Sequence, residues 1–368
     1  MGLSMHNGCM KSNNHWMETL GLRWPVVQAP MAGSQGAGLA VAVSQAGGLG
    51  SLPAATLSLE ALDAALQTLQ ASGLPYNVNA FTHAEPAHDA VQEAAWLAAL
   101  QPLAQQWGVA LPTGPAQAAR QPFSQSMLDV LARYKPPVVS FHFGLPKPEW
   151  LAAIKSWGGQ VLSSATTVDE GLWLQAHGCD VVVAQGLEAG GHRGHFLRAD
   201  LQDQMGLMSL LPQLVAALQV PVLAAGGVVN AASVQAAKRL GAAGVQVGTA
   251  YLFCPEASPH PLHKAALLSA RAVHTQLTNL FTGRPARGIV NGLMQALGGH
   301  AVGAEALSPA APAFPLATHA LVPLRAAAEG QGHDDFIPLW AGQSAALCQP
   351  MSAADLTQLL GQAWQELK

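Results

Sequence analysis

The sequence predicts an α/β fold, a (β/α)8 or TIM barrel that carries a C-terminal lid or substrate-facing subdomain. Eight short strand-like runs occur along the chain, and most are followed by a helical pattern, which is typical of a parallel sheet. The runs are apolar throughout instead of alternating, as expected for strands buried on both faces. With 368 residues, 50% of them hydrophobic and 10% charged, the chain can bury one large barrel with an elaboration, or two domains.

The expected elements follow one another in a regular order. The strands span residues 26–30, 49–53, 76–81, 138–143, 160–165, 180–185, 221–226 and 245–250. Helical patterns occur at 36–46, 59–71, 86–106, 125–134 and 148–157, and glycines close several of them. Thr167 and Glu170 predict a capping box at the start of the next helix, and Asn230 is expected to cap the helix before the last strand. An open doubly wound sheet is the alternative, but it rarely needs eight consecutive repeats.

The rest of the chain divides around this barrel. Residues 1–15 are interpreted as a flexible N-terminal extension, and residues 16–255 as the barrel itself. After residue 255 the repeat breaks, so residues 256–345 are assigned to the lid or substrate-facing segment. Within that segment the Pro-rich stretch 307–323 is expected to be a loop or linker. An amphipathic pattern at 353–367 predicts a final helix, so residues 346–368 are expected to pack on the barrel.

Charge and cysteine content exclude several classes of protein. Lys and Arg number 17, Asp and Glu 21, and no basic stripe is present, which disfavours a nucleic-acid partner. The four cysteines, Cys9, Cys179, Cys254 and Cys348, are far apart and form no CxxC pair, which argues against a disulfide framework or a zinc site and fits a reducing cytoplasm. The charge-free stretch 24–59 is interrupted by glutamines and glycines, so no membrane span is expected.

Ligand-binding residues are expected where the strands end, because active sites of such barrels lie at the carboxyl ends of the strands. Gly226-Gly227 and Gly248-Thr249 follow the last two strands, and glycines let backbone N–H groups approach an anion closely. We interpret them as a cradle for a phosphorylated ligand. The alternative is that these glycines only make tight turns. No GxGxxG follows a strand, so a nicotinamide dinucleotide domain is not indicated.

Two histidines are the candidates for chemistry. His192 lies between glycines in the run 190–194, and an ordinary pKa of about 6.5 would make it a base or a charge stabiliser near neutral pH. The alternative is a loop histidine without a role. His142 ends an apolar strand, so it is either a site residue or a buried histidine satisfied by hydrogen bonds. His195 competes with His192, and the other histidines show no metal-ligand spacing.

Seven motifs occur in an order that resembles the nitronate monooxygenases, formerly called 2-nitropropane dioxygenases. They are APMAG (29–33), NVN (77–79), SFHFG (140–144), AQGLEAGGHRG (184–194), LAAGGV (223–228), VQVGTAYL (245–252) and TGRPARGIVN (282–291). The combination of SFHFG with EAGGHRG is similar to the class I enzymes of bacteria and fungi. The matches cover the chain from about residue 24 to residue 291, whereas the N-terminal leader and the stretch 307–323 carry no resemblance.

The resemblance implies a TIM barrel that binds FMN noncovalently, without a metal or a nicotinamide. By motif, His192 matches the catalytic histidine of the family and His142 a second active-site histidine of class I. Asn77 is an alternative to Asn79, because the register of that strand is open. The residues implied to bind FMN are Pro30, Met31 and Ala32 lining the flavin, Asn79, Gln185 and Gly190 at its ring or ribityl chain, and Gly227, Gln246, Val247, Gly248 and Thr249 at its phosphate.

The implied reaction is the oxidation of an alkyl nitronate by O2 to a carbonyl compound and nitrite, with propionate 3-nitronate as the class I substrate. The expected partners are therefore a small nitronate and O2, with a homodimer as one option for assembly. The nearest rival is an FMN-dependent enoyl-ACP reductase that consumes NADH, since it shares the barrel, the FMN and a similar GGH segment. A barrel that binds a phosphorylated ligand without catalysis is the rival of a different class.

Overall fold

The computed structural model describes residues 15–118, 120–298 and 307–366. Eight parallel strands form one sheet in the order β1-β9-β8-β6-β5-β4-β3-β2. Backbone hydrogen bonds between Val26, Gln28 and Leu49 join the two outer strands, so the sheet closes into a barrel. The predicted (β/α)8 barrel is thereby confirmed. The strands are β1 (Val26–Gln28), β2 (Gly50–Pro53), β3 (Tyr76–Phe81), β4 (Val138–His142), β5 (Gln160–Ala165), β6 (Val181–Gln185), β8 (Val222–Ala225) and β9 (Gly244–Val247).

Helices surround this barrel, and their apolar faces explain their places. In α3 (Leu59–Ala71), Ser58 caps the first turn, and Leu62, Leu66 and Leu69 form one buried face. The other surrounding helices are α2 (Ala37–Gln45), α5 (Gln125–Tyr134), α6 (Pro148–Ser156), α7 (Val168–Ala176), α8 (Leu207–Ala217), α9 (Ala231–Arg239) and α13 (Ala353–Glu366). The C-terminal helix α13 packs against α2 and α9.

The two predicted caps have different outcomes. Asn230 and Ser233 form a full capping box at the start of α9. At α7 only half of the box is present: Thr167 accepts from the Glu170 N–H, but the Glu170 carboxylate turns away to accept from Thr166 and Phe196. The buried Glu170 carboxylate therefore links the end of β5 to the loop at Phe196 by hydrogen bonds, and it does not cap the helix.

The barrel interior is apolar at the amino ends of the strands and polar at their carboxyl ends. Trp16, from helix α1 (His15–Leu20), packs with Leu22, Val27 and other interior strand residues at the amino end. The expected N-terminal extension over 1–15 lies, except for His15, outside the described residues. Further along the strands the buried residues are polar, among them Gln28, Ser51, Asn77, Asn79 and Gln185. This change of polarity indicates the end at which a ligand is recognised.

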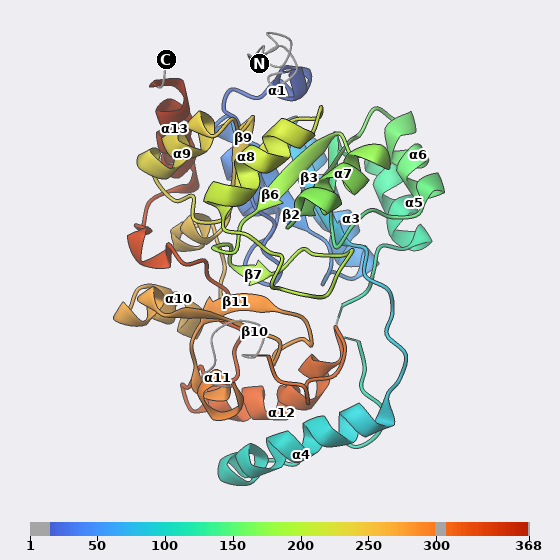
Figure 1. Ribbon diagram of the computed structural model, residues 1–368, viewed down its shortest axis with the longest axis vertical. Coiled ribbons are helices and arrows are strands. Elements are labelled where there is room, and N and C mark those ends of the chain that lie inside the picture. The colour runs from blue at the N-terminus through green and yellow to red at the C-terminus, as the bar shows by residue number, and fades with distance from the viewer. Residues whose placement is uncertain (1–14, 119, 299–306, 367–368) are drawn as a thin grey trace, which may run out of the picture.

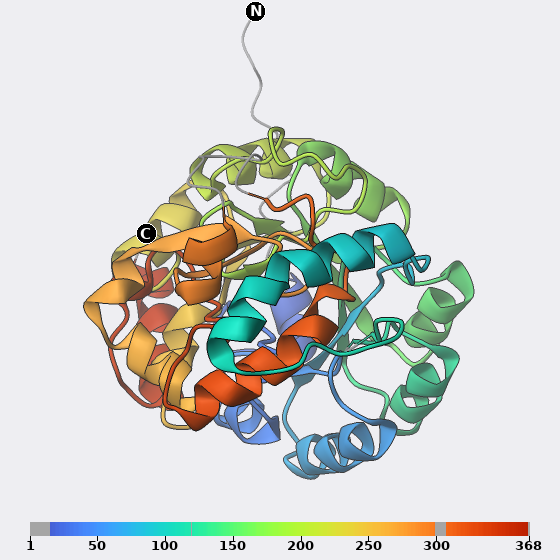
Figure 2. The same ribbon diagram turned by 90° about the horizontal axis from the view of Figure 1, so that it is seen from below.

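A second layer covers the carboxyl end of the barrel. It contains α10 (Pro261–Leu267), α11 (Gly292–Leu297), α12 (Ala317–Gly330) and a three-stranded sheet of β7 (Gly191–His192), β10 (Thr275–Thr278) and β11 (Ala286–Ile289). The helix α4 (Ala90–Trp107), from the β3–β4 connection, packs beside α12, as both views show (Figures 1 and 2). The covering layer therefore joins two segments that are far apart in the sequence.

The expectation of a loop or linker over 307–323 is wrong in its last part, because α12 begins at Ala317. Pro323 lies inside this helix, although proline removes one backbone donor and normally disfavours a helix interior. Leu321 and Leu324 are buried in the core shared with α4, together with Trp96 and Leu100. Burial of this apolar face offsets the cost of the proline.

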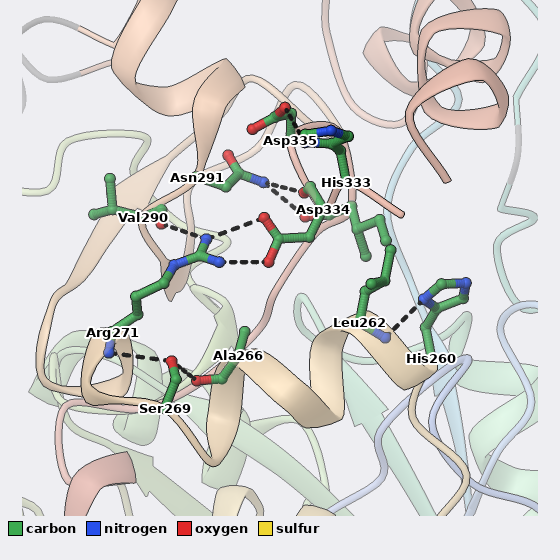
Figure 3. Close-up of polar contacts among 11 residues, drawn as sticks. His260, Leu262, Ala266, Ser269, Arg271, Val290, Asn291, His333, Asp334 and Asp335 are labelled. Atoms are coloured by element: carbon green, nitrogen blue, oxygen red, sulfur yellow. Dashed lines mark hydrogen bonds and ion pairs between the residues drawn. The ribbon is translucent and has the colours of Figure 1, made fainter. Parts of the chain in front are cut away.

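An ion pair fixes the chain that leads back to the barrel. Arg271 donates two hydrogen bonds to the Asp334 carboxylate, of 2.6 and 3.1 Å, and one of 3.1 Å to the Val290 carbonyl oxygen (Figure 3). Asn291 donates to the Asp334 backbone carbonyl at 3.1 Å. Such a bidentate contact sets the position of residues 334–337, and the chain continues from there to Trp340 at the barrel mouth. No helix among the described residues is long and apolar enough to cross a membrane.

Candidate active site

A cavity of about 210 Å³ lies at the carboxyl ends of the barrel strands, beneath the covering layer. All the site residues predicted from the sequence line it, with the exception of Val247. They come from the ends of six barrel strands or from the turns that follow them, which is the arrangement expected for a barrel of this class. The predicted residues that line the cavity are Pro30, Met31, Ala32, Asn79, His142, Gln185, Gly190, His192, Gly227, Gln246, Gly248 and Thr249.

Strand geometry explains the exception and places the two candidate asparagines at different depths. Successive side chains of a strand point to opposite faces, so Gln246 faces the barrel interior while Val247 packs among the surrounding helices. The Val247 side chain is thus turned away from the cavity, and its carbonyl oxygen accepts from the Ala29 N–H at 2.8 Å. Asn77 and Asn79 both point inward, but Asn77 lies deeper, fully buried, and donates to Ser51 Oγ at 2.9 Å. Asn79 lines the cavity.

The two glycine turns lie side by side, because β8 and β9 are hydrogen-bonded neighbours. Gly226 and Gly227 have φ values of +111° and +72°, which glycine adopts without strain. Among the described residues, the N–H groups of Gly227 and Val228 find no acceptor, although Val228 is buried. Unpaired N–H groups at a turn that side chains leave open are suited to bind an anion.

The segment 341–345 closes over these turns. Gly342 donates from its N–H to Thr249 Oγ1 at 3.0 Å, and Gln343 donates to the Glu188 carbonyl oxygen at 2.9 Å. A Cβ on Gly190 would lie 2.6 Å from the backbone of Ala341 and Gly342. Gly190 is therefore required for close approach of two backbones, a structural role beside its place in the cavity wall.

His192 is held over the cavity by the covering layer. It belongs to β7, which pairs with β11, and its ring Nε2 lies 2.9 Å from Thr282 Oγ1. Its ring also packs near Phe314 and Trp340, at centroid distances of 5.3 and 5.6 Å. The ring Nδ1 has no partner among the described residues. The imidazole is thus fixed at one nitrogen and available at the other.

His142 and Gln185 hold the backbone of His192 instead of reaching freely into the cavity. The His192 carbonyl oxygen accepts from Gln185 Nε2 at 2.9 Å and from His142 Nε2 at 3.1 Å. His142 Nδ1 lies 2.6 Å from Ser164 Oγ. Since a carbonyl only accepts, Nε2 carries the proton and Ser164 donates to Nδ1. Gln185 Oε1 also accepts from Gly194 N–H at 2.7 Å. Both side chains are positioning residues in this arrangement.

Arg193 anchors the same loop from below. Its side chain is fully buried and donates to the carbonyl oxygens of Gln185 and Gly186 and to Gln204 Oε1, at 2.6 to 2.8 Å. Burial lowers its pKa to about 9. The sequence motif marks Arg193 only as a member of the glycine run. Its role in fixing the strand end depends on contacts that spacing does not reveal.

The histidines of the site are neutral at pH 7. Burial lowers the pKa of His142 to about 3 and holds the pKa of His192 well below 6.5, with the Arg120 charge as the next cause at His192. Burial therefore moves the pKa of His192 away from the ordinary value of about 6.5 on which the sequence expectation was based. A neutral imidazole retains its ability to accept a proton, but it does not carry a standing positive charge. His195 is buried and does not line the cavity.

Several cavity residues are absent from the sequence prediction. Arg120 and Phe81 line the wall on the side of β3, while His263, Trp340 and Ser344 come from the covering layer. Phe143 stands at φ +76°, stacked under the Arg284 guanidinium at 4.0 Å from its ring centroid. A non-glycine residue in this region is strained, and such strain often occurs at functional sites. Only the SFHFG motif marks this position in the sequence.

Comparison with known proteins identifies the family. The family model described as nitronate monooxygenase matches residues 13–362. The chain belongs to the nitronate monooxygenase family. A curated nitronate monooxygenase of Pseudomonas aeruginosa is 38% identical over 343 residues, covering 93% of this chain and 96% of that protein. The family resemblance predicted from the motifs is thereby confirmed, and the chain is an enzyme of an oxidoreductase family.

Solved structures agree with this family and with the barrel. The structure of nitroalkane oxidase from Streptomyces ansochromogenes is similar with a TM-score of 0.83 and 35% identity, covering 95% of this chain and 98% of that chain. FabK from Thermotoga maritima is similar with a TM-score of 0.68 and 22% identity, covering 95% of each chain. At that identity the second likeness shows the fold alone.

Proposed function

We propose that this enzyme is an FMN-dependent nitronate monooxygenase, which oxidises alkyl nitronates such as propionate 3-nitronate with O2 to a carbonyl compound and nitrite. The observation that carries the proposal is one cavity with two different walls. One wall contains the glycine turns at Gly226-Gly227 and Gly248. The other contains the imidazole of His192, whose Nε2 contacts Thr282 and whose Nδ1 has no partner among the described residues. An anion cradle together with an oriented base fits a phosphorylated cofactor and a reacting substrate.

The residues present fit FMN. The unpaired N–H groups of Gly227 and Val228 suit its single phosphate, and Ser344 Oγ lies within 3.7 Å of the position a Cβ would take on Gly227. Met31 and Asn79, at the ends of β1 and β3, would line the flavin ring. Bound FMN would supply the redox chemistry between the nitronate and O2.

The side chain of His192 supports two tasks through one contact. If Nε2 donates to the Thr282 hydroxyl, Nδ1 is unprotonated and can accept the α-proton of a neutral nitroalkane. If Thr282 instead donates to Nε2, then Nδ1 carries the proton and can donate to a nitronate oxygen. The threonine hydroxyl can take either role, so the same geometry serves both forms of the substrate. Phe81, Phe314 and Trp340 surround this position and restrict access of water.

The proposal extends to the cellular setting. Cys179, Cys254 and Cys348 are free thiols in the structure. Free cysteines are compatible with a reducing cytoplasm, which is the location we propose for the enzyme.

Oxygen uptake with nitrite release from propionate 3-nitronate tests the activity, and a pair of variants tests the cradle. Gly227→Asp places a carboxylate where the phosphate would bind, next to Glu188, whose Cβ lies 3.5 Å from the added Cβ. Gly227→Asn is the matched control, since asparagine has nearly the same shape without the charge and also tolerates positive φ. We expect heat to release FMN from the parent and the Asn variant, and little flavin from the Asp variant. Full flavin content in Gly227→Asp would mean that the phosphate binds elsewhere.

A further inference from the structure

Arg120 is a half-buried cation in the cavity wall. It reaches the cavity from the connection between β3 and β4. The hydrogen bond that the described residues offer it, from Nη1 to Thr318 Oγ1, is 3.4 Å long, and that hydroxyl already donates to the Phe281 carbonyl oxygen at 2.8 Å. A guanidinium has five N–H donors, and 3.4 Å lies beyond the usual hydrogen-bond distance. Most of the donor capacity of Arg120 therefore remains for a ligand.

Among the described residues, no carboxylate compensates the charge of Arg120. Burial and the nearby Arg325 charge lower its pKa, and no carboxylate in the described part of the chain raises it. Arg325 has its own partner, because its Nε donates to Glu329 Oε1 at 2.6 Å. Taking a cation out of water costs free energy unless an opposite charge pairs with it. The cavity at Arg120 is thus electrostatically incomplete without a bound anion.

An anion bound at Arg120 would lie apart from the phosphate of the proposed cofactor. The strand order places β3 and β4 across the barrel from β8 and β9, which carry the glycine turns. Phe81 and Phe314, which contact the His192 ring at centroid distances of 6.2 and 5.3 Å, give this part of the site an apolar lining. The Arg120 charge also lowers the pKa of His192, so the two side chains are within electrostatic reach of each other.

We propose that Arg120 is a specificity-determining residue that binds a carboxylate of the substrate while the nitronate carbon lies at His192. The inference rests on the proposed function and deepens it, because it adds the group that selects the substrate. The ligand class is a short aliphatic acid with the nitronate at the end remote from its carboxylate. A nitronate that ends in a methyl group lacks the partner for Arg120, and it leaves that cation unpaired.

A matched pair of substrates and three variants test the assignment. Propionate 3-nitronate and propyl-1-nitronate both have three carbons, and they differ by a carboxylate in place of a methyl group. We expect Arg120→Gln to lower kcat/KM for propionate 3-nitronate by about 100-fold, because one partner of a desolvated charge pair is lost. The value for propyl-1-nitronate should change by less than about 3-fold, and Arg120→Lys should recover part of the loss. Arg325→Gln removes a neighbouring charge outside the cavity wall and should leave the preference intact.

A binding measurement separates this inference from the proposed activity. Calorimetric titration without oxygen compares 3-nitropropionate with 1-nitropropane, and it needs no turnover. The parent should bind 3-nitropropionate about 100-fold more tightly than Arg120→Gln does. The parent and the variant should bind 1-nitropropane with similar affinity. Selective binding without oxygen uptake on either nitronate would refute the proposed function and leave the role of Arg120 standing. The role of Arg120 would be overturned if Arg120→Gln oxidised both nitronates with the same ratio of kcat/KM values as the parent. It would also be overturned if the variant lost equal affinity for 3-nitropropionate and 1-nitropropane.

Discussion

At the scale of single residues, His192 combines a fixed ring with a neutral charge state. One ring nitrogen is held by Thr282, and the backbone carbonyl is held by Gln185 and His142. Burial lowers the pKa of the imidazole well below 6.5 and so favours its neutral form at pH 7. The ring is therefore in the charge state that can accept a proton, and it carries no permanent positive charge.

Replacing His192 by Asn tests that role with two substrate forms. Loss of a general base typically costs a factor of about 10² to 10⁴, so turnover of a neutral nitroalkane should fall by that amount. A nitronate is already deprotonated and loses only a hydrogen-bond donor, so its kcat/KM should fall by about 10-fold or less. Flavin content should persist. His177→Asn, at the exposed residue that follows α7 and outside the cavity, is the control. Equal losses for both forms would contradict the base role.

At the scale of elements, the site depends on close approach between a glycine run and the returning chain. A Cβ on Gly190 would overlap the backbone at residues 341 and 342, so Gly190→Ala must displace that segment. We expect a loss of about 1 to 3 kcal/mol in the free energy of unfolding, with weaker flavin retention. At Gly38, in α2, an added Cβ meets nothing within 4 Å. Gly38→Ala should therefore stabilise by about 0.5 to 1 kcal/mol. Urea unfolding measures both, and a harmless Gly190→Ala would show that the segment is not tightly seated.

The sequence allows the barrel elements, the helix α4 and the existence of a covering segment to be predicted, but not the strands of that segment or the helix α12. Each barrel strand is an apolar run next to a glycine or proline turn, a local signal that survives without tertiary information. The strands β10 and β11 read TQLT and ARGI, and neither shows strand periodicity. The helix α12 contains a proline, and its burial depends on α4, which lies more than 200 residues earlier. Such long-range pairing leaves no pattern in either segment alone.

The same limit applies to the site. Glycine turns and the two histidines stand in recognisable motifs at strand ends, so their convergence follows from the barrel topology. Arg120 and Trp340 lie in segments without motif or periodicity, and only the fold brings them to the cavity. The lowered pKa of His192 could not be predicted from the sequence either, because it is caused by burial and by the charge of Arg120.

At the scale of the whole molecule, buried histidines make stability depend on pH. Burial lowers the pKa of His83 and His263 to about 4, and of His142 and His195 to about 3, from 6.5. Below pH 6.5 the unfolded chain therefore binds protons that the folded chain does not. The contribution of these histidines to the free energy of unfolding is fully present above pH 6.5. It is lost as the pH drops toward 4, by up to about 1.4 kcal/mol per pH unit for each site.

Urea unfolding at pH 7.5 and pH 5.0 measures this dependence. We expect a clearly lower free energy of unfolding at pH 5.0. His263→Gln removes one of the four sites and should make the difference between the two pH values smaller. Equal free energies at both values would mean that the buried histidines take up protons without unfolding.

The most direct test of the central proposal is an oxygen-electrode measurement on the purified protein with propionate 3-nitronate, followed by nitrite analysis and an anaerobic mixture with NADH. The account predicts a yellow protein containing FMN, oxygen uptake that depends on the nitronate, nitrite as a product, and a flavin that NADH does not bleach at a useful rate. Rapid bleaching by NADH, with no oxygen uptake on the nitronate, would contradict it and favour the enoyl-ACP reductase reaction instead.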